Sequence, residues 1–555
     1  MMGIPTLTTY MKENGHIESV ILKEMSSKIV IDGFCLCYKL FRGIKCRDYF
    51  EFYKKVFDFF GMLKSIGIEA YVVVDGIDYN NEKAKTNMKR LKRNLEELRR
   101  VESRIEMLTN NEIFVPPLAK KVFADSVCEA GVKFFVADGE ADRDVVSLAN
   151  HVGCPVLGYD SDFFIFNIDH GLILMPDNLE DLKREVRYFD CRKFDQTCNF
   201  SHPQIRLFLP FCLGNDFHGR HALPELGINR EAKAELIVEK LSTSSLKIDD
   251  YQEKLASDLK FYGVVPRSFE DLSQHSAFSV SVPQWIVSRF KRGEFSRTAM
   301  YFLASDLLEG KKIWKYLLVV EDLKLESAWK VTDSVLPYVI GALFSCYQRD
   351  RIPSIVVKIR QDCFCALVDE INLSLSPKHL NILGSHDLHT VHDDMSVQER
   401  EKIFLRTFHC KSVSKSLNNV PKELKLAVIA SRCWLRFVDV QNVDYNFEAF
   451  ISALVLCFQT CSGARPIDEA GHHREHPMAR LRRVHYLAQW ECMLHLTNSF
   501  NEILNYPFTY TSLGRMFSGT LFQSFFVSGP GVHTRLDFEG ACMYEAITKK
   551  LLPTS

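Results

Sequence analysis

Four short apolar segments, each ended by acidic residues, constrain the fold of this chain more than any other feature. They are KIVID (28–32), AYVVVDG (70–76), VKFFVADGEAD (132–142) and PVLGYDSD (155–162). Apolar residues at helical spacing fill the stretches 49–65 and 141–153 between them. Apolar strands that alternate with helices predict an α/β fold, in which a parallel sheet is flanked by helices.

The pattern changes after about residue 235, where amphipathic helices replace the strands, for example over 283–310 and 399–408. A polar segment with Gly, Pro and three histidines, CSGARPIDEAGHHREHP, interrupts them at 461–477. The sequence therefore predicts a mostly α-helical C-terminal half. The predicted regions are an α/β domain (1–235), a helical region (236–460), a loop or linker (461–478) and a helical C-terminal region (479–555).

The composition excludes several classes of protein. The chain has 555 residues, 46% of them hydrophobic and 25% charged, which is typical of globular domains. A net charge of −1 places any nucleic-acid surface locally rather than over the whole molecule. The 17 scattered cysteines form no CxxC pair, and no apolar run is long enough to span a bilayer. We expect a soluble, intracellular protein with no signal peptide and, because a Walker-type loop is absent, no nucleotide cofactor.

Acidic residues stand where the predicted parallel strands end, and the carboxyl ends of such strands share one edge of a sheet. Carboxylates that close repel each other and need a cation, and oxygen ligands select Mg²⁺ or Mn²⁺. Two such ions about 3.5–4 Å apart suit in-line attack at phosphorus. A single Asp after a strand is, however, more often a helix cap, and Asp-Ser-Asp alone is often a turn. The seven candidate ligands are Asp32, Asp75, Glu140, Asp142, Asp160, Asp162 and Asp216.

The same motifs carry a resemblance to a known family. KIVIDG, YVVVDG and LGND, together with GEADRDVVSLANHVGCPVLGYDSDFFIF, resemble the flap-endonuclease/XPG superfamily of PIN-like nucleases. The run from EADRD to DSDF resembles the asteroid family within it, as does the opening MGIPTLTTYM. The resemblance covers about residues 2–235 and continues more weakly beyond. It implies a PIN-like fold and assigns all seven acids to a two-ion Mg²⁺ site, in which Asp142 is one methylene shorter than the usual glutamate.

A charged helix predicted over 81–108 resembles the basic helix that reaches the scissile phosphate in this superfamily. Its first half has few acids, whereas its second half suits a solvated helix with i,i+4 ion pairs. The resemblance implies catalytic roles for Lys83 and for Lys89 or Arg90, and nucleic-acid binding by Lys85, Lys92 and Arg93. It also implies base stacking by Tyr38, although a buried core tyrosine is an equal alternative.

Two departures from the family pattern affect the substrate. An additional methionine precedes Gly3, the glycine that resembles a nucleic-acid-binding family position, so a start at Met1 leaves Gly3 without a free amine. The segment 218–237 lacks the Gly-x-Gly hairpin whose backbone amides grip duplex phosphates. We therefore expect single-stranded or overhanging (3′) DNA as the substrate.

The resemblance implies a structure-specific DNA endonuclease of double-strand-break repair in the nucleus, with protein partners at the helical half. A basic cluster, ARLRR (479–483), is a weak candidate for a nuclear localisation signal. Two alternatives stay open. One is a non-catalytic scaffold in receptor-tyrosine-kinase (EGF receptor) signalling. The other is an RNA-directed nuclease, although no motif in the sequence indicates recognition of a ribose 2′-hydroxyl.

Overall fold

The computed structural model describes most of the chain in two compact units. The described residues are 3–45, 47–77, 116, 118–216, 219–244, 248–280, 282–304, 311–315, 319, 321, 325–345, 354–360, 368–438, 446–463, 477–527, 536–549 and 551. Unit 1 comprises Met1–Lys39, Val56–Lys89 and Val127–Phe278, and unit 2 comprises Leu40–Lys55, Arg90–Ser126 and Ser279–Ser555. The boundaries predicted at residues 235, 460 and 478 stay a prediction.

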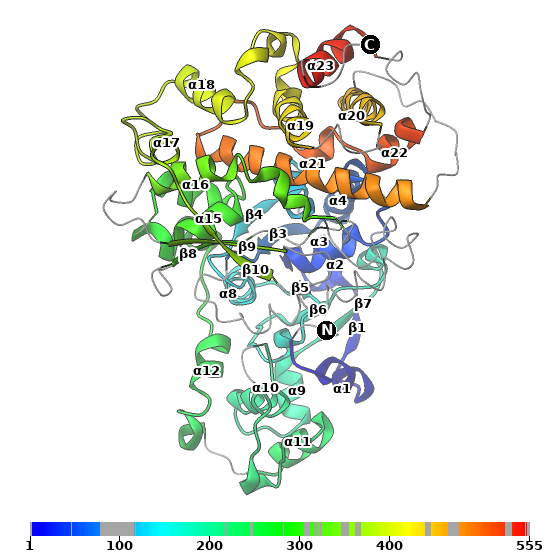
Figure 1. The fold of residues 1–555 in the computed structure, drawn as a ribbon. Coiled ribbons are helices and arrows are strands. Elements are labelled where there is room, and N and C mark those ends of the chain that lie inside the picture. The colour runs from blue at the N-terminus through cyan, green and yellow to red at the C-terminus, as the bar shows by residue number, and fades with distance from the viewer. Residues whose placement is uncertain are drawn as a thin grey trace. The chain divides into compact units, whose positions relative to one another are not determined.

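A seven-stranded sheet of order β1-β7-β6-β5-β2-β3-β4 forms the centre of unit 1 (Figure 1). Neighbouring strands from β6 to β4 in this order are parallel, whereas β7 is antiparallel to both of its neighbours, β6 and β1. The strands are β1 (Glu18–Val20), β2 (Lys28–Asp32), β3 (Glu69–Val74), β4 (Lys133–Val136), β5 (Val156–Gly158), β6 (Leu172–Leu174) and β7 (Val186–Phe189). The predicted parallel sheet flanked by helices is thus confirmed, and three of its strands, β1, β6 and β7, were missed because they are only three or four residues long.

Helices cover the sheet of unit 1. The predicted helix after Glu140 is α8, which packs against β2 and β5 and ends at Gly153 with a φ of 73°. That left-handed conformation is the usual helix end that glycine permits. The helices with all or most of their residues in unit 1 are α1 (Leu7–Glu13), α2 (Leu22–Met25), α3 (Gly33–Phe41), α4 (Tyr49–Ser65), α8 (Asp142–Val152), α9 (Cys191–Thr197), α10 (Phe208–Leu213), α11 (Ala234–Ser242), α12 (Ala256–Tyr262) and α13 (Phe269–Gln274).

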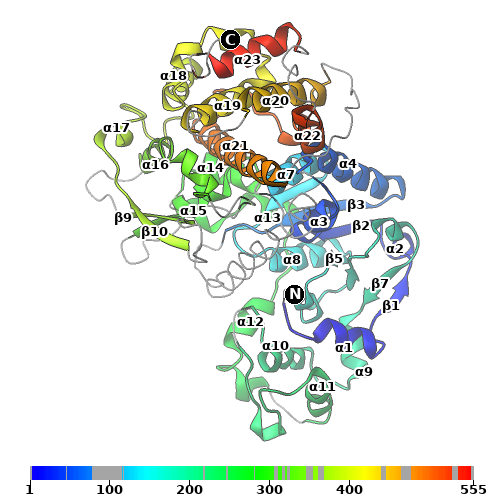
Figure 2. The ribbon, with the colours of Figure 1, turned by 45° about the vertical axis from the view of Figure 1, so that its right-hand side comes forward.

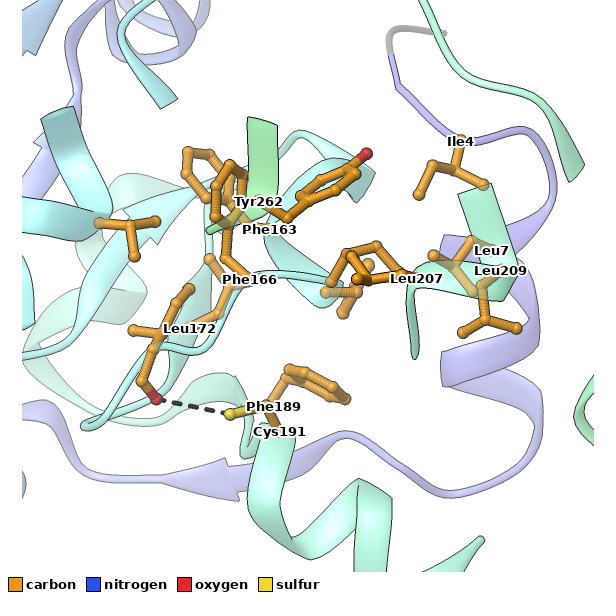
Figure 3. Close-up of a cluster of buried hydrophobic side chains, with 14 of the residues drawn as sticks. Ile4, Leu7, Phe163, Phe166, Leu172, Phe189, Cys191, Leu207, Leu209 and Tyr262 are labelled. Atoms are coloured by element: carbon orange, nitrogen blue, oxygen red, sulfur yellow. Dashed lines mark hydrogen bonds between the residues drawn. The ribbon is translucent and has the colours of Figure 1, made fainter. Parts of the chain in front are cut away.

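An apolar core joins the strands of unit 1 to the helices packed against them. The rings of Phe163, Phe166 and Tyr262 gather there, and the Phe166 and Tyr262 centroids are 4.9 Å apart in an edge-to-face arrangement (Figure 3). The Cys191 thiol donates to the Ile168 carbonyl, 3.6 Å away, at the lower side of the same core. Because Phe163 directly follows Asp162, this packing fixes the chain at one of the predicted ligands.

Unit 2 is mostly helical, as the sequence predicts. Helix α19 packs on α21 and α23, and α20 packs on α22 (Figure 2). The buried Trp490 indole donates to Ser431 Oγ at 3.0 Å, which joins α21 to α19. The helices are α14 (Gln284–Lys291), α15 (Arg297–Ala304), α16 (Leu336–Phe344), α17 (Pro377–Leu380), α18 (Val397–Thr407), α19 (Lys425–Phe437), α20 (Phe447–Cys461), α21 (Pro477–Ile503), α22 (Gly519–Val527) and α23 (Phe538–Thr548), and α7 (Ala119–Glu129) lies mostly in this unit.

A three-stranded sheet in unit 2 was not predicted. It consists of β8 (Lys311–Lys315), β9 (Ser354–Arg360) and β10 (Val368–Leu373), with β8 parallel and β10 antiparallel to β9. The β-branched run SIVVKIR of β9 was a usable signal for it. None of the helices in the described part of the chain combines the length and hydropathy needed to cross a bilayer.

Candidate functional site

Six of the seven predicted ligands stand at the carboxyl ends of four adjacent parallel strands, an arrangement that we call the acid edge. Asp32 is the last residue of β2, Asp75 follows β3 directly, Glu140 and Asp142 follow β4, and Asp160 and Asp162 follow β5. The register pairs Asp32 with Val73 of β3, so Asp75 lies only two residues farther along the neighbouring strand. The sheet therefore brings together at one edge acids that lie up to 130 residues apart in the sequence.

Each of three carboxylates at the acid edge caps a neighbouring backbone. Asp32 Oδ1 accepts from Cys35 N at 3.3 Å, Asp160 Oδ1 from Asp162 N at 3.2 Å, and Asp75 Oδ1 from Ala141 N at 2.9 Å. The capping role considered from the sequence is therefore present. A carboxylate has two oxygens and about four lone-pair sites, so capping and metal ligation can coexist.

Gly76 lets the end of β3 approach the turn after β4. Its N–H donates to Gly139 O at 2.6 Å, and a Cβ at this position would overlap the Ala137 and Asp138 carbonyl oxygens. Only glycine allows this approach, which draws Asp75 toward Glu140 and Asp142. The glycine of the Asp-Gly pair in YVVVDG is thus required for close backbone packing, in addition to any chemical role of the aspartate.

Electrostatic repulsion is evident at Asp32. Burial, together with the charges of Asp75 and Asp160, raises the pKa of the Asp32 carboxyl to about 8, although hydrogen bonds from the Cys35 and Phe34 backbone oppose the shift. Neighbouring carboxylates act in this way because each disfavours ionisation of the other. The charges of the three acids, at the ends of β5, β2 and β3, therefore repel one another. A bound cation would relieve this repulsion.

A buried network holds Asp162, whose side chain is nearly inaccessible. The Tyr262 hydroxyl from α12 donates to Asp162 Oδ1 at 2.7 Å, and burial together with the Asp162 charge raises the Tyr262 pKa well above its usual range. Asn215 Nδ2 donates to the buried Asp258, also on α12, at 3.2 Å. Since Asp216 directly follows Asn215, α12 positions the chain around both the DSD and the LGND motifs. Sequence reasoning missed Tyr262 and Asp258, because no local pattern marks them.

The N-terminal segment also reaches the acid edge. Ile4 N donates to Ser161 Oγ at 2.6 Å, and Ser161 Oγ donates back to Ile4 O at 3.1 Å. Gly3 has a φ of 81°, and a Cβ there would overlap Asp160 Oδ1. The residue between the two aspartates therefore fastens the N-terminal segment, and Gly3 lies directly against Asp160.

Among the predicted nucleic-acid-binding residues, Tyr38 lies in α3 with 40% of its side chain exposed, so the alternative of a buried core tyrosine is wrong. Six basic residues lie outside the described residues, and their roles stay predictions: Lys83, Lys85, Lys89, Arg90, Lys92 and Arg93. In the basic cluster at 479–483, Arg483 is buried with its guanidinium over the Phe526 ring, which disfavours a localisation signal there.

The described residues contain no set of three or more Asp, Glu, His or Cys side chains that lie close enough to hold a metal ion as they stand. Carboxylates that repel each other come within ligand distance of one point when a cation neutralises them. The all-oxygen donor set of the acid edge fits a hard divalent cation in chemistry, and its metal stays a proposal.

The comparisons with known proteins agree on one family. A family model for the asteroid N-terminal domain matches residues 395–527. The chain is similar to the asteroid proteins. It is 23% identical to single-strand DNA endonuclease ASTE1 of Homo sapiens over 94% of this chain and 85% of the relative. It is 33% identical to protein asteroid of Drosophila melanogaster, over 30% of this chain and 20% of that protein.

The resemblance predicted from the N-terminal motifs is thereby confirmed, and the matched domain lies in the helical part of the chain. Among solved structures, the chain is similar to the catalytic core of Rad2 in complex with DNA substrate. That similarity has 15% identity, covers 51% of this chain and 85% of the other, and has a TM-score of 0.31, which is too low to support a conclusion.

Proposed function

We propose that this chain is a metal-dependent, structure-selective DNA endonuclease that cuts single-stranded or overhanging (3′) DNA ends, with a role in double-strand-break repair. The convergence of six carboxylates on the ends of four adjacent parallel strands carries the proposal. A fold that needed these residues only as caps would have no reason to gather Asp32, Asp75 and Asp160 so closely that they raise the Asp32 pKa. The relatives named single-strand DNA endonuclease support the same reading.

The acid edge and Asp216 would hold two Mg²⁺ ions, for which Mn²⁺ can substitute. Divalent cations in such a site activate water for attack and neutralise charge on the phosphate. The residues of this chain hold and orient the reacting groups. Tyr262 keeps Asp162 in place through a buried hydrogen bond, and the buried Asp142 begins α8 beside the Asp75 carboxylate that caps Ala141.

Residues of the predicted basic helix, Lys83 and Lys89 or Arg90, would contact the scissile phosphate and stabilise its developing charge. Tyr38, exposed on α3, would stack on a base near the cut. The missing Gly-x-Gly hairpin favours substrates with unpaired ends over tightly anchored duplex.

Cleavage of labelled oligonucleotides by the purified full chain tests this proposal. Single-stranded, 3′-overhang, 5′-flap and blunt DNA, and single-stranded RNA, are each incubated with Mg²⁺, Mn²⁺ or EDTA. We expect metal-dependent cutting of the DNA substrates that have unpaired ends. The double variant Asp160→Ala and Asp162→Ala should lose cleavage and keep most DNA binding, while Asp169→Asn, a solvent-exposed carboxylate in an ion pair with Arg192, serves as the matched control.

The remaining outcomes would favour an alternative function or contradict the proposed site. Preference for RNA would favour the RNA-directed nuclease. No cutting of any substrate with either metal would favour the non-catalytic scaffold. Unchanged cleavage by the double variant would contradict the two-metal assignment.

Nuclear localisation and protein partners belong to the same proposal. The asteroid model matches the helical residues 395–527, so this part is the candidate region for partners. Fluorescent tagging of the full chain tests localisation, and a protein confined to the cytoplasm would contradict the nuclear assignment.

A further inference from the structure

Tyr159 occupies an unusual position at the acid edge. It follows the last residue of β5 and precedes Asp160, yet 57% of its side chain is exposed, while the residues on either side of this turn are buried or half-buried. Within the described part of the chain its hydroxyl makes no hydrogen bond and its ring contacts no other ring. Burial of apolar surface stabilises the folded state by about 25 cal/mol for each Å². A ring that is mostly exposed therefore loses most of the stabilisation that its burial would give. A structural role does not account for this side chain.

The backbone around Tyr159 is fixed, although its ring is exposed. The Tyr159 N–H hydrogen-bonds the Cys35 sulfur, and Cys35 N in turn donates to Asp32 Oδ1 at 3.3 Å. Tyr159, which directly precedes Asp160, therefore lies beside the first turn of α3, the helix that begins directly after Asp32. A ring on a fixed backbone loses little conformational freedom when it meets a ligand.

The neighbouring helix presents a second exposed tyrosine. Tyr38 is three residues after Cys35, and residues at i and i+3 share one helix face. Its side chain is 40% exposed. The two tyrosines thus belong to adjacent elements at one end of the sheet: Tyr159 directly precedes Asp160, and Tyr38 lies on the helix that begins directly after Asp32.

We propose that the Tyr159 ring stacks on an unpaired nucleobase, so that it adds a second platform beside the one expected at Tyr38 and selects single-stranded DNA. This inference rests on the proposed function. In a duplex each base is already stacked between its neighbours, so an exposed aromatic ring gains a partner only from an unpaired base. Stacking of this kind is tolerant of base identity, because every base has a π-face. Tyr159 then selects DNA substrates by whether their bases are unpaired, and not by their base sequence.

The test uses the full chain in EDTA, where binding is separated from cleavage. Single-stranded DNA with one 2-aminopurine is titrated, and both affinity and the quenching of 2-aminopurine by a stacked ring are measured. Tyr159→Ala should weaken single-strand binding by about 5- to 150-fold, equivalent to about 1–3 kcal/mol, and should abolish Tyr159-dependent quenching. Tyr159→Phe should retain both properties, and Tyr159→Leu, which keeps apolar bulk without a π-face, should lose the quenching.

Two controls separate stacking from general damage. Blunt duplex should bind all variants equally, and Phe538→Ala removes another ring, 80% exposed, that lies far along the chain in unit 2. Unchanged affinity and quenching in Tyr159→Ala, or equal losses in Tyr159→Phe and Tyr159→Ala, would overturn the inference. A wild-type protein that binds no single strand would overturn it together with the proposed function. One that binds and quenches through Tyr159 but cuts nothing with any metal would uphold stacking while rejecting the nuclease.

Discussion

Both units bury carboxylates, but opposite kinds of charge surround them. In unit 1, burial and the charges of the neighbouring acids Asp75 and Asp160 together raise the pKa of Asp32 to about 8. In unit 2, burial also raises the pKa of Glu491, but the Arg47 guanidinium, 2.8 Å away, opposes it, and the Tyr49 hydroxyl donates to the same carboxylate at 3.0 Å. The buried acids of unit 1 therefore repel one another, whereas the charge of Glu491 in unit 2 is neutralised by Arg47.

This difference distinguishes the acid edge, a candidate functional site, from the Arg47–Glu491 ion pair, which supports the fold. A buried acid paired with a cation is complete within the fold and needs no ligand. Acids that repel one another lower stability, and such an arrangement is typical of functional sites, where stability is lost in exchange for chemistry. The comparison predicts opposite effects when single charges are removed from the two regions.

The largest effect is expected from Arg47→Met in unit 2. This change leaves Glu491 buried without its cation, and such a loss costs about 3–5 kcal/mol of the free energy of unfolding. Urea denaturation of the wild type and the variant measures it. The double variant Arg47→Met and Glu491→Met removes both charges and should recover most of the loss. An unchanged midpoint for the single variant would contradict the supporting role.

A pH effect of intermediate size is expected from Glu502, another buried acid of unit 2. Burial raises the pKa of the Glu502 carboxyl to about 8, while Lys121 and Arg289 oppose the shift. A folded-state pKa above the unfolded value means stability that is full at low pH and is lost as pH rises through 8. The free energy of unfolding should therefore fall by roughly 2 kcal/mol between pH 6 and 8. Urea denaturation at constant ionic strength measures this slope, and Glu502→Gln should flatten it. A slope that survives in Glu502→Gln would assign the effect to another group.

At the acid edge, Asp32→Asn should act in the opposite direction from Arg47→Met. The amide keeps an oxygen for the Cys35 N–H and removes one of three repelling charges. In EDTA at about pH 9, one unit above the pKa of the wild-type carboxyl, where that group is largely ionised, we expect the free energy of unfolding to rise by about 0.5–2 kcal/mol. Cleavage activity should be lost. Asp169→Asn, on the exposed surface of the same unit, should change stability by less than about 0.5 kcal/mol. A destabilised Asp32→Asn protein would indicate that the capping role of this residue dominates.

The sequence predicted the acid edge well because its signals are local. Asp32 and Asp75 each end a run of β-branched and apolar residues, and Asp160 and Asp162 follow such a run, so strand ends and chemistry coincide within a few residues. The partners of these acids are remote. Tyr262 lies 100 residues from Asp162, and no spacing rule relates them.

The ion pair of unit 2 shows the same limit more strongly. Arg47 and Glu491 are 444 residues apart, and each resembles an ordinary surface charge in its local sequence. Burial of a charge is decided by tertiary packing, which periodicity within one element does not report. The sheet β8–β9–β10 was missed for a different reason, because its strands lie among amphipathic helices and the β-branched run of β9 was not weighed against that pattern.

The smallest effect is expected where neutral hydrogen bonds, rather than charges, organise the acid edge. Ser161→Ala removes both bonds to Ile4 and leaves a nearly buried N–H and C=O without that partner. We expect faster amide exchange over residues 4–11, equivalent to a local loss of about 1 kcal/mol, with little change in global unfolding. Hydrogen-exchange mass spectrometry measures this, and Ser161→Thr, which keeps the hydroxyl, is the matched control. If exchange stays slow in Ser161→Ala, apolar packing of Ile4 and Leu7 holds the segment. If exchange is faster and cleavage falls in parallel, the N-terminal segment is part of the site that Asp160 and Asp162 form.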